Sequence, residues 1–407
     1  MKSGNWHKST SGVLTANSFA AELIERPNAT IDYPTLSVVV TLTLLGVVMV
    51  YSSTFHRGFH FLKWHFLRAV IGFLALWLGT KLNIFRLTHA RVQVFLLILA
   101  FGSLIAALFW GELVGVTKRN IFGVVQPTEF VKFIAIIWLA GYFAKLTDSG
   151  KKTTFVNSFL IPSLVVGLIV GLTLLQPAVG TSFIIAMSSG ILFVLAGVRF
   201  RYLFTGILFV ALVAGLILLI MPKLRGSRYR YIVDRWNKFR AGDRYQQQQA
   251  LIALGSGGPL GRGLGEGRQK YYFLPELHND FIFCAIGEEM GFIGCLGVMV
   301  LYLIFFRRSL RIARRTTSEF GRLLAVGIGV VIILYAFVHQ AVALSIVPTT
   351  GQPLPFVSYG GSALIANLFA AGMVLKVSKY RRNGIEEGFS GRGWNWGAYL
   401  SGSRPRP

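Results

Sequence analysis

The stretch LPELHNDFIFCAIGEEMGFIG, residues 274–294, joins a polar loop to an apolar segment that carries two adjacent acids. The loop holds Glu276, His278 and Asp280. Ionisable groups inside apolar segments are costly in a membrane, and they usually mark a site, a pathway or a buried pair. The neighbouring segments must therefore show whether this stretch enters a membrane and what its carboxylates do there.

The composition is that of a membrane protein. Of the 407 residues, 54% are hydrophobic and 14% are charged, and the mean hydropathy is +0.59. Apolar runs of about 17 to 25 residues can cross a hydrocarbon core of roughly 30 Å. The sequence predicts an all-α polytopic membrane protein with ten transmembrane helices, near residues 35–53, 62–80, 92–110, 128–145, 157–175, 181–198, 201–221, 280–306, 323–346 and 362–378.

Basic residues follow every even-numbered span, which indicates the cytoplasmic side by the positive-inside rule. Examples are Lys81, Lys145, Arg199, Arg308 and Lys379. Both termini are therefore expected in the cytoplasm. The predicted organisation is a cytoplasmic arm, a transmembrane domain and a second cytoplasmic arm, over residues 1–34, 35–378 and 379–407.

The large outer loop between spans seven and eight, residues 222–279, departs from this charge pattern. It carries eleven Lys or Arg and four acids, which gives eleven minus four, or +7. The loop is either basic without consequence or placed to meet an anionic substrate at the outer membrane surface. Its Gly-rich centre is no nucleotide fingerprint, because no strand and helix of a βαβ unit flank it. Amphipathic pieces near residues 228–254 are expected to lie along the lipid surface.

The stretch KRNIFGVVQPTEFVKF, residues 118–133, leads into span four. Glu129 and Lys132 are three residues apart and therefore share a helix face. They form either a helix-stabilising ion pair or a pair that orients substrate. Arg119, just upstream, is a candidate for binding an anion.

The stretch PTTGQPLPFVSYGGSALIAN, residues 348–367, has three prolines, three glycines and no charge. Ser358 and Ser362 immediately precede span ten, where the amides of a helix N-terminus suit an anion. The alternative is a re-entrant turn with a purely structural role.

Asp280 is expected at the outer membrane boundary, at the start of span eight. It is either a working carboxylate or a helix cap, a role that Asp performs well. Glu276 and His278 are candidates for contact with substrate.

The two acids further along, Glu288 and Glu289, are expected about 12 to 14 Å deeper on the same helix, where at least one must be paired or protonated. Lys132 is a conceivable partner. Cys284 and Cys295 are eleven residues apart, which on one continuous helix is too far for a disulfide.

Several motifs together resemble the SEDS family, which includes FtsW, RodA and SpoVE. In order they are MVYSS, QPTEFVKF, QPAVGT, the run LIALGSGGPLGRGLGEGRQKYYFLPELHNDFIFCAIGEEMGFIG, and PTTGQPLPFVSYGGS. The resemblance covers about residues 33–382 and is strongest to the FtsW and SpoVE branch. It implies a peptidoglycan glycosyltransferase that polymerises lipid II on the outer face of the bacterial cytoplasmic membrane.

The resemblance also assigns residues. The family's essential aspartate, in its LPE-x-H-x-D-F motif, corresponds to Asp280. The Glu and Lys of QPSE-x-x-K correspond to Glu129 and Lys132, and the Arg before that motif corresponds to Arg119.

Three positions depart from the family pattern. Ala178 replaces the acid of QPD-x-GT, so any role of that carboxylate is lost in this chain. Ala250 stands where a Ser is usual, and Asn279 replaces a Thr, a polar exchange that we expect to be tolerated.

The implied reaction converts an α-linked donor into a β-linked glycan, so it inverts the anomeric centre and needs a base on the attacking side. Asp280 is the predicted base. Arg119, Lys132, Arg235 and Lys270 are candidates to neutralise the diphosphate leaving group. A divalent cation, Mg or Mn, could share that task, although the sequence contains no clear set of metal ligands.

The implied partners are the lipid II substrate, membrane lipid, a class B penicillin-binding protein as transpeptidase and other membrane proteins of the division complex, with no nucleic acid. The expected location is the division septum. The alternatives are a transporter that flips lipid II, a non-catalytic scaffold, and an elongation role of the RodA type.

Overall fold

The computed structural model describes residues 30–110, 112–114, 117–120, 125–149, 154–176, 178–204, 245–271 and 273–380. Most of the predicted first arm, the part of span seven beyond Phe204, Arg235 and the predicted second arm from residue 381 lie outside these residues.

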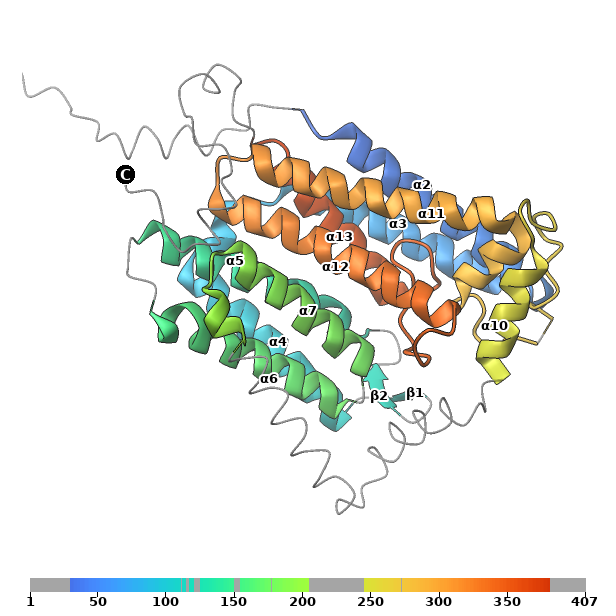
Figure 1. The fold of residues 1–407 in the computed structure, drawn as a ribbon, viewed down its shortest axis with the longest axis horizontal. Coiled ribbons are helices and arrows are strands. Elements are labelled where there is room, and N and C mark those ends of the chain that lie inside the picture. Colours follow the sequence, from blue (N-terminus) through green and yellow to red (C-terminus); the bar gives the residue numbers. More distant parts are fainter. Residues whose placement is uncertain are drawn as a thin grey trace, which may run out of the picture.

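The described chain is a bundle of long helices that run roughly along one axis (Figure 1). The long helices are α2 Tyr33–Thr54, α3 His60–Lys81, α4 Ala90–Trp110, α5 Pro127–Asp148, α6 Ile161–Leu175, α7 Val179–Leu195, α11 Ile282–Arg315, α12 Glu319–Ala343 and α13 Gly361–Val377. The smaller elements are the 3-10 helices Phe55–Arg57 and Ile84–Thr88, the π-helix Val156–Leu160, the helix α10 Tyr245–Ser256, and two antiparallel strands, β1 Glu112–Val114 and β2 Thr117–Asn120.

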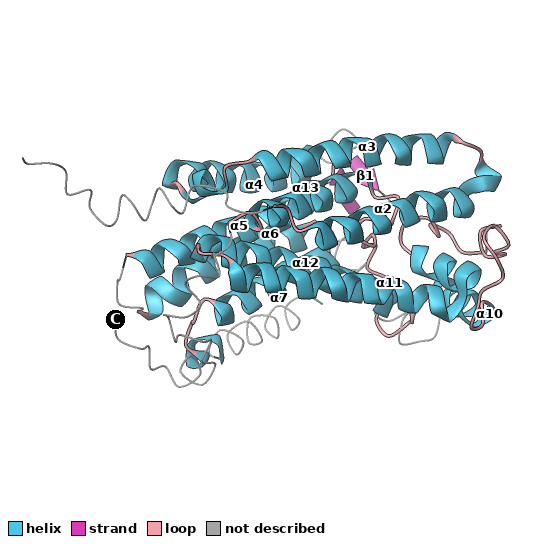
Figure 2. Cartoon of the chain, turned by 90° about the horizontal axis from the view of Figure 1, so that it is seen from above, coloured by secondary structure: helices cyan, strands magenta, loops and turns pink. Residues whose placement is uncertain are grey.

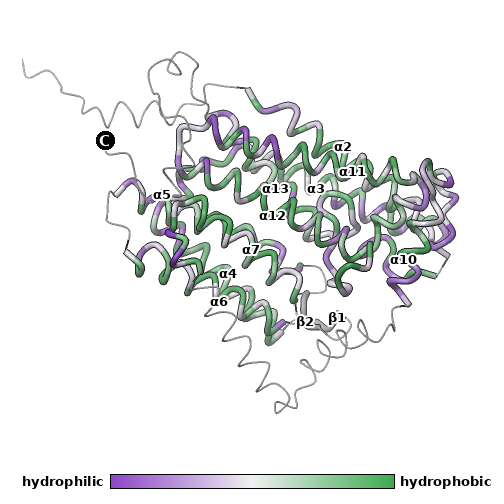
Figure 3. The backbone as a smooth tube through the Cα atoms, in the orientation of Figure 1, coloured by the Kyte–Doolittle hydropathy of each residue, from purple (hydrophilic) through white to green (hydrophobic). Residues whose placement is uncertain are grey.

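The prediction of a helical polytopic membrane protein is confirmed, and the short β1–β2 hairpin is an addition to it. Seven helical segments of the described chain are long and apolar enough to cross a membrane, and α7 and α13 are shorter apolar helices. Eight of the ten predicted spans coincide with helices. Most of span 201–221 lies outside the described residues, and span 280–306 is interrupted within α11 at Gly291. Figure 3 shows hydrophobic backbone through the middle of these helices and hydrophilic segments toward their ends.

One end of the bundle gathers basic side chains, as the charge pattern predicts. Arg308, near the end of α11, donates from Nε to Asp32 Oδ2 at 3.0 Å, just before α2 begins. The backbone N–H of Asp32 donates to Ser378 Oγ at 3.1 Å, directly after α13. The start of α2 and the ends of α11 and α13 therefore share one end, which we call the basic end.

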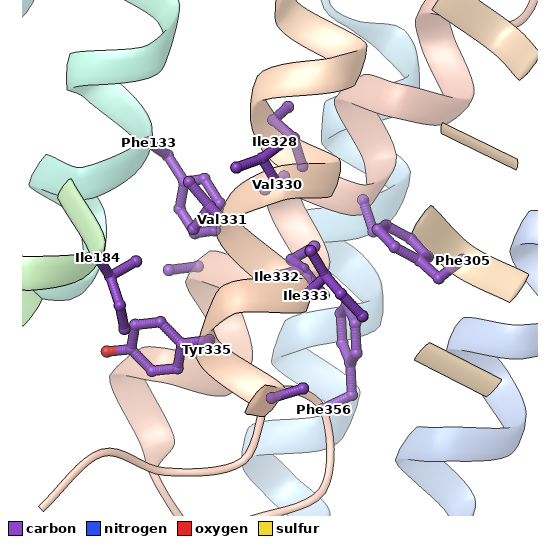
Figure 4. Packing of buried hydrophobic residues seen from close by; sticks show 14 of the residues in the cluster. Phe133, Ile184, Phe305, Ile328, Val330, Val331, Ile332, Ile333, Tyr335 and Phe356 are labelled. Atoms are coloured by element: carbon purple, nitrogen blue, oxygen red, sulfur yellow. The ribbon is translucent and has the colours of Figure 1, made fainter. Parts of the chain in front are cut away.

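The centre of the bundle is α12, which is buried along most of its length. Figure 4 shows its residues between Phe133 of α5, Ile184 of α7 and Phe305 of α11, with Phe356 of the loop before α13 beside them. Close packing of this kind fixes where the polar segments at the opposite end, here called the outer end, can lie.

The helix α11 is broken at Gly291, which has φ 67° and ψ −165°. A Cβ added at Gly294 would lie 3.5 Å from Ile286 Cγ2, and one at Gly287 would lie 3.2 Å from Cys295 Sγ. Residues eight apart on a continuous helix are separated by about 12 Å. The chain therefore folds back at Gly291 into a tight helical hairpin, whose first arm runs from Ile282 to Met290.

The Gly-rich loop 257–270 caps both helix ends exposed by this break. The N–H groups of Arg262 and Gly263 donate to the carbonyls of Glu288 and Glu289, and the N–H groups of the two residues after Gly291 donate to carbonyls of Gly258 and Pro259. A broken helix leaves such groups without intrahelical partners, and in a membrane each unsatisfied group is costly. The GSGGPLGRGLGEG sequence thus stabilises the hairpin by binding the backbone groups at its tip.

The side chains of both acids bind the same loop. Glu288 accepts a hydrogen bond from the backbone N–H of Arg268 at 2.7 Å. Glu289 accepts from Ser52 Oγ at 2.6 Å and pairs with Lys270 Nζ at 3.3 Å. The expectation that the acids lie deep on a continuous helix with Lys132 as partner is wrong, because the chain reverses at Gly291 and places them at the hairpin tip, level with the outer end of α2.

We expect Gly291→Ala to reduce the yield of folded protein strongly. An added Cβ would lie 2.3 Å from the backbone N of Gly261, and the φ of 67° is strained for any residue with a side chain. Such strain costs about 1–3 kcal/mol before the clash is counted. Size-exclusion chromatography of a fluorescent fusion in detergent measures the yield. Gly297→Ala is the matched control, since a Cβ there meets nothing within 4 Å, and an unchanged yield for Gly291→Ala would contradict the hairpin.

Candidate active site

Asp280 lies at the base of the hairpin, in the loop that leads into α11. Its backbone N–H donates to the carbonyl of Glu276 at 2.9 Å, and its side chain is half-buried. The N-cap position of α11 is Phe281, whose side chain makes no capping hydrogen bond, and Asp280 lies one residue before it.

The loop before α13 holds the Asp280 segment from one side. Ser358 Oγ donates to the carbonyl of Asn279 at 2.7 Å and accepts from the N–H of Leu354 at 2.8 Å. The N–H of Tyr359 donates to the carbonyl of His278 at 3.1 Å. Ser358 is buried and thus positions the aspartate segment. Because the contact at Asn279 uses its backbone carbonyl, the exchange of Thr for Asn leaves that contact intact.

This loop is re-entrant, so Asp280 lies below the outer surface of the bundle. A Cβ at Gly46 of α2 would lie 2.6 Å from the carbonyl oxygen of Val357. Gly46 is six residues before Ser52, which binds Glu289 at the hairpin tip, and six helical residues span about 9 Å. The aspartate is therefore deeper than the two glutamates, which reverses the order expected on one continuous helix.

Aromatic rings surround the Asp280 segment. The ring of His278 lies 5.1 Å from that of Phe61 and 5.3 Å from that of Tyr359. Burial, followed by the charge of Arg57, lowers the pKa of His278 to about 4. The imidazole is therefore neutral at physiological pH and can take part in a hydrogen bond without adding charge. Glu276 is 58% exposed at its side chain.

The residues Glu129 and Lys132 form a closed pair in the core. Lys132 Nζ lies 2.6 Å from Glu129 Oε2, and Tyr335 OH donates to Glu129 Oε1 at 2.6 Å. The ammonium group also lies 3.8 Å from the centre of the Tyr335 ring. Both charged side chains are at most 1% exposed. This geometry favours the ion-pair alternative.

The remaining predicted site residues lie apart from this pair. Ser362 Oγ accepts from the backbone N–H of Gln126 at 3.0 Å, which ties the start of α13 to the start of α5. Arg119 belongs to β2, shortly before α5, and its side chain lies outside the described part. Lys270 is at the hairpin tip with Glu289, so the structure does not bring it beside Asp280.

Two of the three departures are packed into the interior. Ala178 is 1% exposed and precedes α7, and Ala250 is fully buried in α10.

The described residues contain no group of three or more His, Cys, Asp or Glu side chains that could hold a metal ion. This part of the chain therefore does not form a protein cage for the divalent cation considered from the sequence.

Two residues of α3, Arg68 and His65, lie next to the loop before α13 and were not among the predicted site residues. Both contact Tyr359: the Arg68 guanidinium carbon lies 4.7 Å from its ring centre, and the His65 ring lies 5.8 Å away. The sequence could have marked both residues as candidates, because an Arg and a His inside the apolar run 62–80 are costly in a membrane. Tyr335, the partner of Glu129, carried no comparable signal.

The chain matches a known family over most of its length. The family described as "Cell cycle protein" (FtsW, RodA and SpoVE) matches residues 34–383. A probable peptidoglycan glycosyltransferase FtsW of Geobacter sp. (strain M18) is 36% identical over 369 residues, with 86% of this chain and 97% of the relative covered. Stage V sporulation protein E of Bacillus subtilis is 33% identical, with 85% and 97% covered.

Solved structures share the fold. The rod shape determining protein RodA of Thermus thermophilus has a TM-score of 0.65 at 25% identity, with 87% of this chain and 98% of that chain covered. A chain in a structure described as "Structural coordination of polymerization and crosslinking by a peptidoglycan synthase complex" has a TM-score of 0.70 at 24% identity, with 86% and 99% covered.

Proposed function

The chain belongs to the family of cell cycle proteins formed by FtsW, RodA and SpoVE, and we propose that it polymerises lipid II with Asp280 as the general base. It is a multi-pass membrane protein and a peptidoglycan glycosyltransferase, as its curated FtsW relatives are named. The observation that carries the assignment of the base is the placement of Asp280. This carboxylate lies on a loop held by hydrogen bonds from Ser358 and Tyr359, beneath the outer end of the bundle.

The proposed reaction uses this chain's residues in a defined way. The carboxylate of Asp280 takes the proton from the attacking sugar hydroxyl of the acceptor, while the bond from the donor's anomeric carbon to its diphosphate breaks. Attack from the opposite face inverts the anomeric centre. A general base of this kind contributes about 10²–10⁴-fold to the rate. The neutral His278 lies next to this loop and is a candidate for contact with the sugar.

The cationic groups divide into two sets. Lys132 and Lys270 are neutralised by Glu129 and Glu289 in the structure, so their contribution to the leaving diphosphate is indirect. Arg119 remains a candidate for direct contact, as does Arg235, which lies outside the described residues.

The main support for the hypothesis that the protein flips lipid II was the expected position of two acids near the membrane midplane, where the binding sites of transporters lie. Glu288 and Glu289 instead clamp the hairpin tip, so that alternative has lost its main support. A scaffold role alongside catalysis is compatible with the fold.

We expect the purified protein to convert fluorescent lipid II into glycan polymers that gel electrophoresis resolves. The same preparation in vesicles, probed with labelled lipid II and a reducing agent that quenches only the outer leaflet, tests flipping. Polymer without flipping is the expected result. Flipping without polymer would overturn the proposal and favour the transporter.

Partners and location are part of the proposal. A class B penicillin-binding protein and other division-complex membrane proteins are the expected partners, and the septum is the expected site. The relatives named FtsW and SpoVE at 33–36% identity support the division and sporulation branch over elongation.

A further inference from the structure

The helices α3 and α13 lie side by side over most of their length (Figure 2). Their contact is built on small residues that let the backbones approach closely, as is common between membrane helices. A Cβ at Gly79 would lie 2.6 Å from the carbonyl of Phe369, and one at Gly372 would lie 2.2 Å from that of Leu76. We call this line of close contact between α3 and α13 the seam. Along α3 it continues toward the outer end through Gly72 and ends at Arg68.

Arg68 fills the outer end of the seam. A Cβ at Gly361, the first residue of α13, would lie 2.7 Å from Arg68 Nε and 3.1 Å from its Cζ. The guanidinium also stacks on Tyr359, whose N–H binds the carbonyl of His278, two residues before Asp280. Arg68 is therefore linked to the aspartate loop through Tyr359, which contacts Arg68 with its ring and His278 with its backbone N–H.

The charge of Arg68 has no counter-charge within the described part of the chain. No carboxylate there lies within ion-pair distance of it, while the neighbouring Leu67 and Ile71 of α3 are 45% and 42% exposed. Arg68 is eight residues from the outer start of α3, about 12 Å along the helix. A guanidinium in this position, between lipid-facing side chains, is costly unless an anion meets it.

A second side chain at the same place also lacks a partner. His65, one turn outward on α3, is fully buried, and neither ring nitrogen has a hydrogen-bond partner in the structure. Its ring faces the same Tyr359 that Arg68 stacks on. The first N–H groups of α13 lie beside the guanidinium, and such groups have no intrahelical acceptor. The N–H groups at the start of α13, the His65 ring and the Arg68 guanidinium thus lie close together around Tyr359.

We propose that Arg68, His65 and the start of α13 form a binding subsite for the diphosphate of a polyprenyl-linked substrate that enters from the lipid side of α3. A guanidinium binds phosphate oxygens through two parallel hydrogen bonds, and a helix N-terminus adds amide donors. The exposed apolar residues of α3 would contact the polyprenyl chain. The subsite rests on the proposed function, because Tyr359 and His278 connect it to Asp280.

The test measures binding of undecaprenyl diphosphate, the probe, to protein in nanodiscs of phosphatidylcholine by native mass spectrometry. It is done in an Asp280→Asn background, so that no turnover occurs. Arg68→Gln is expected to weaken binding about tenfold or more, the loss typical of a charged hydrogen bond. Gly361→Ala, which keeps the charge but displaces the guanidinium, is expected to weaken it as well. Lys63→Gln removes the same charge from an exposed position of α3 and is expected to leave binding unchanged.

Two outcomes would overturn the subsite. One is equal affinity of wild type and Arg68→Gln for the probe; the other is an equal loss in Lys63→Gln, which would indicate general surface charge. A parallel series in nanodiscs that contain phosphatidylglycerol identifies the source of the phosphate: if only phosphatidylglycerol binding depends on Arg68, the ligand is a phospholipid headgroup and the proposal fails. Polymerisation by the wild type is measured separately, so failure of the subsite and failure of the proposed function are distinguishable.

Discussion

Asp280→Asn is expected to abolish glycan polymerisation while the protein stays folded. The amide has nearly the shape of the carboxylate, but it cannot accept the proton of the attacking hydroxyl. The contacts of Ser358 and Tyr359 with this loop use its backbone carbonyls, so the substitution leaves those contacts in place. Loss of a general base lowers the rate by about 10²–10⁴-fold. The assay is polymerisation of fluorescent lipid II with excess substrate, which reports the turnover rate.

The matched control is Glu266→Gln, which removes an acid from an exposed position of the same outer loop. We expect its rate to stay within a few-fold of wild type. Chromatographic profile and thermal stability establish that both variants are folded. Polymerisation by a folded Asp280→Asn protein at a rate near that of wild type would exclude the aspartate as base and direct attention to another group in the loop.

Lys132→Met is expected to lower the stability of the protein strongly. It leaves Glu129 as a buried carboxylate with Tyr335 as its donor but without its cation. Removing one partner of a buried pair costs about 3–5 kcal/mol, because the remaining charge stays desolvated. Thermal unfolding in detergent, followed by tryptophan fluorescence, measures the effect.

Two further variants separate the pair from other causes. The double substitution Glu129→Gln with Lys132→Met removes both charges, so we expect it to regain most of the lost stability. Lys145→Met, at an exposed position near the end of the same helix, is expected to change stability by about 0.5 kcal/mol or less. If the double variant is as unstable as Lys132→Met, packing and not charge pairing determines the cost.

The sequence by itself determined the membrane class and the positions of most helices, and it predicted Asp280 as the base of the candidate site. Hydropathy and charge are local properties of the chain, and a run of apolar residues must form a helix in lipid to satisfy its own backbone. The family motifs located Asp280 in the same way, because each is a short continuous segment. Eight of the ten predicted spans accordingly coincide with described helices.

Only the tertiary structure decided how the charged residues are paired and how deep they lie. From the sequence, Glu288 and Glu289 belonged to a straight helix, since nothing local marks Gly291 as a reversal point among several neighbouring glycines. The reversal is stabilised by loop 257–270, which lies about twenty to thirty residues earlier in the chain. Likewise, Arg68 meets Tyr359 across nearly three hundred residues of chain. Such contacts depend on how distant segments pack, and packing is a property of the whole bundle.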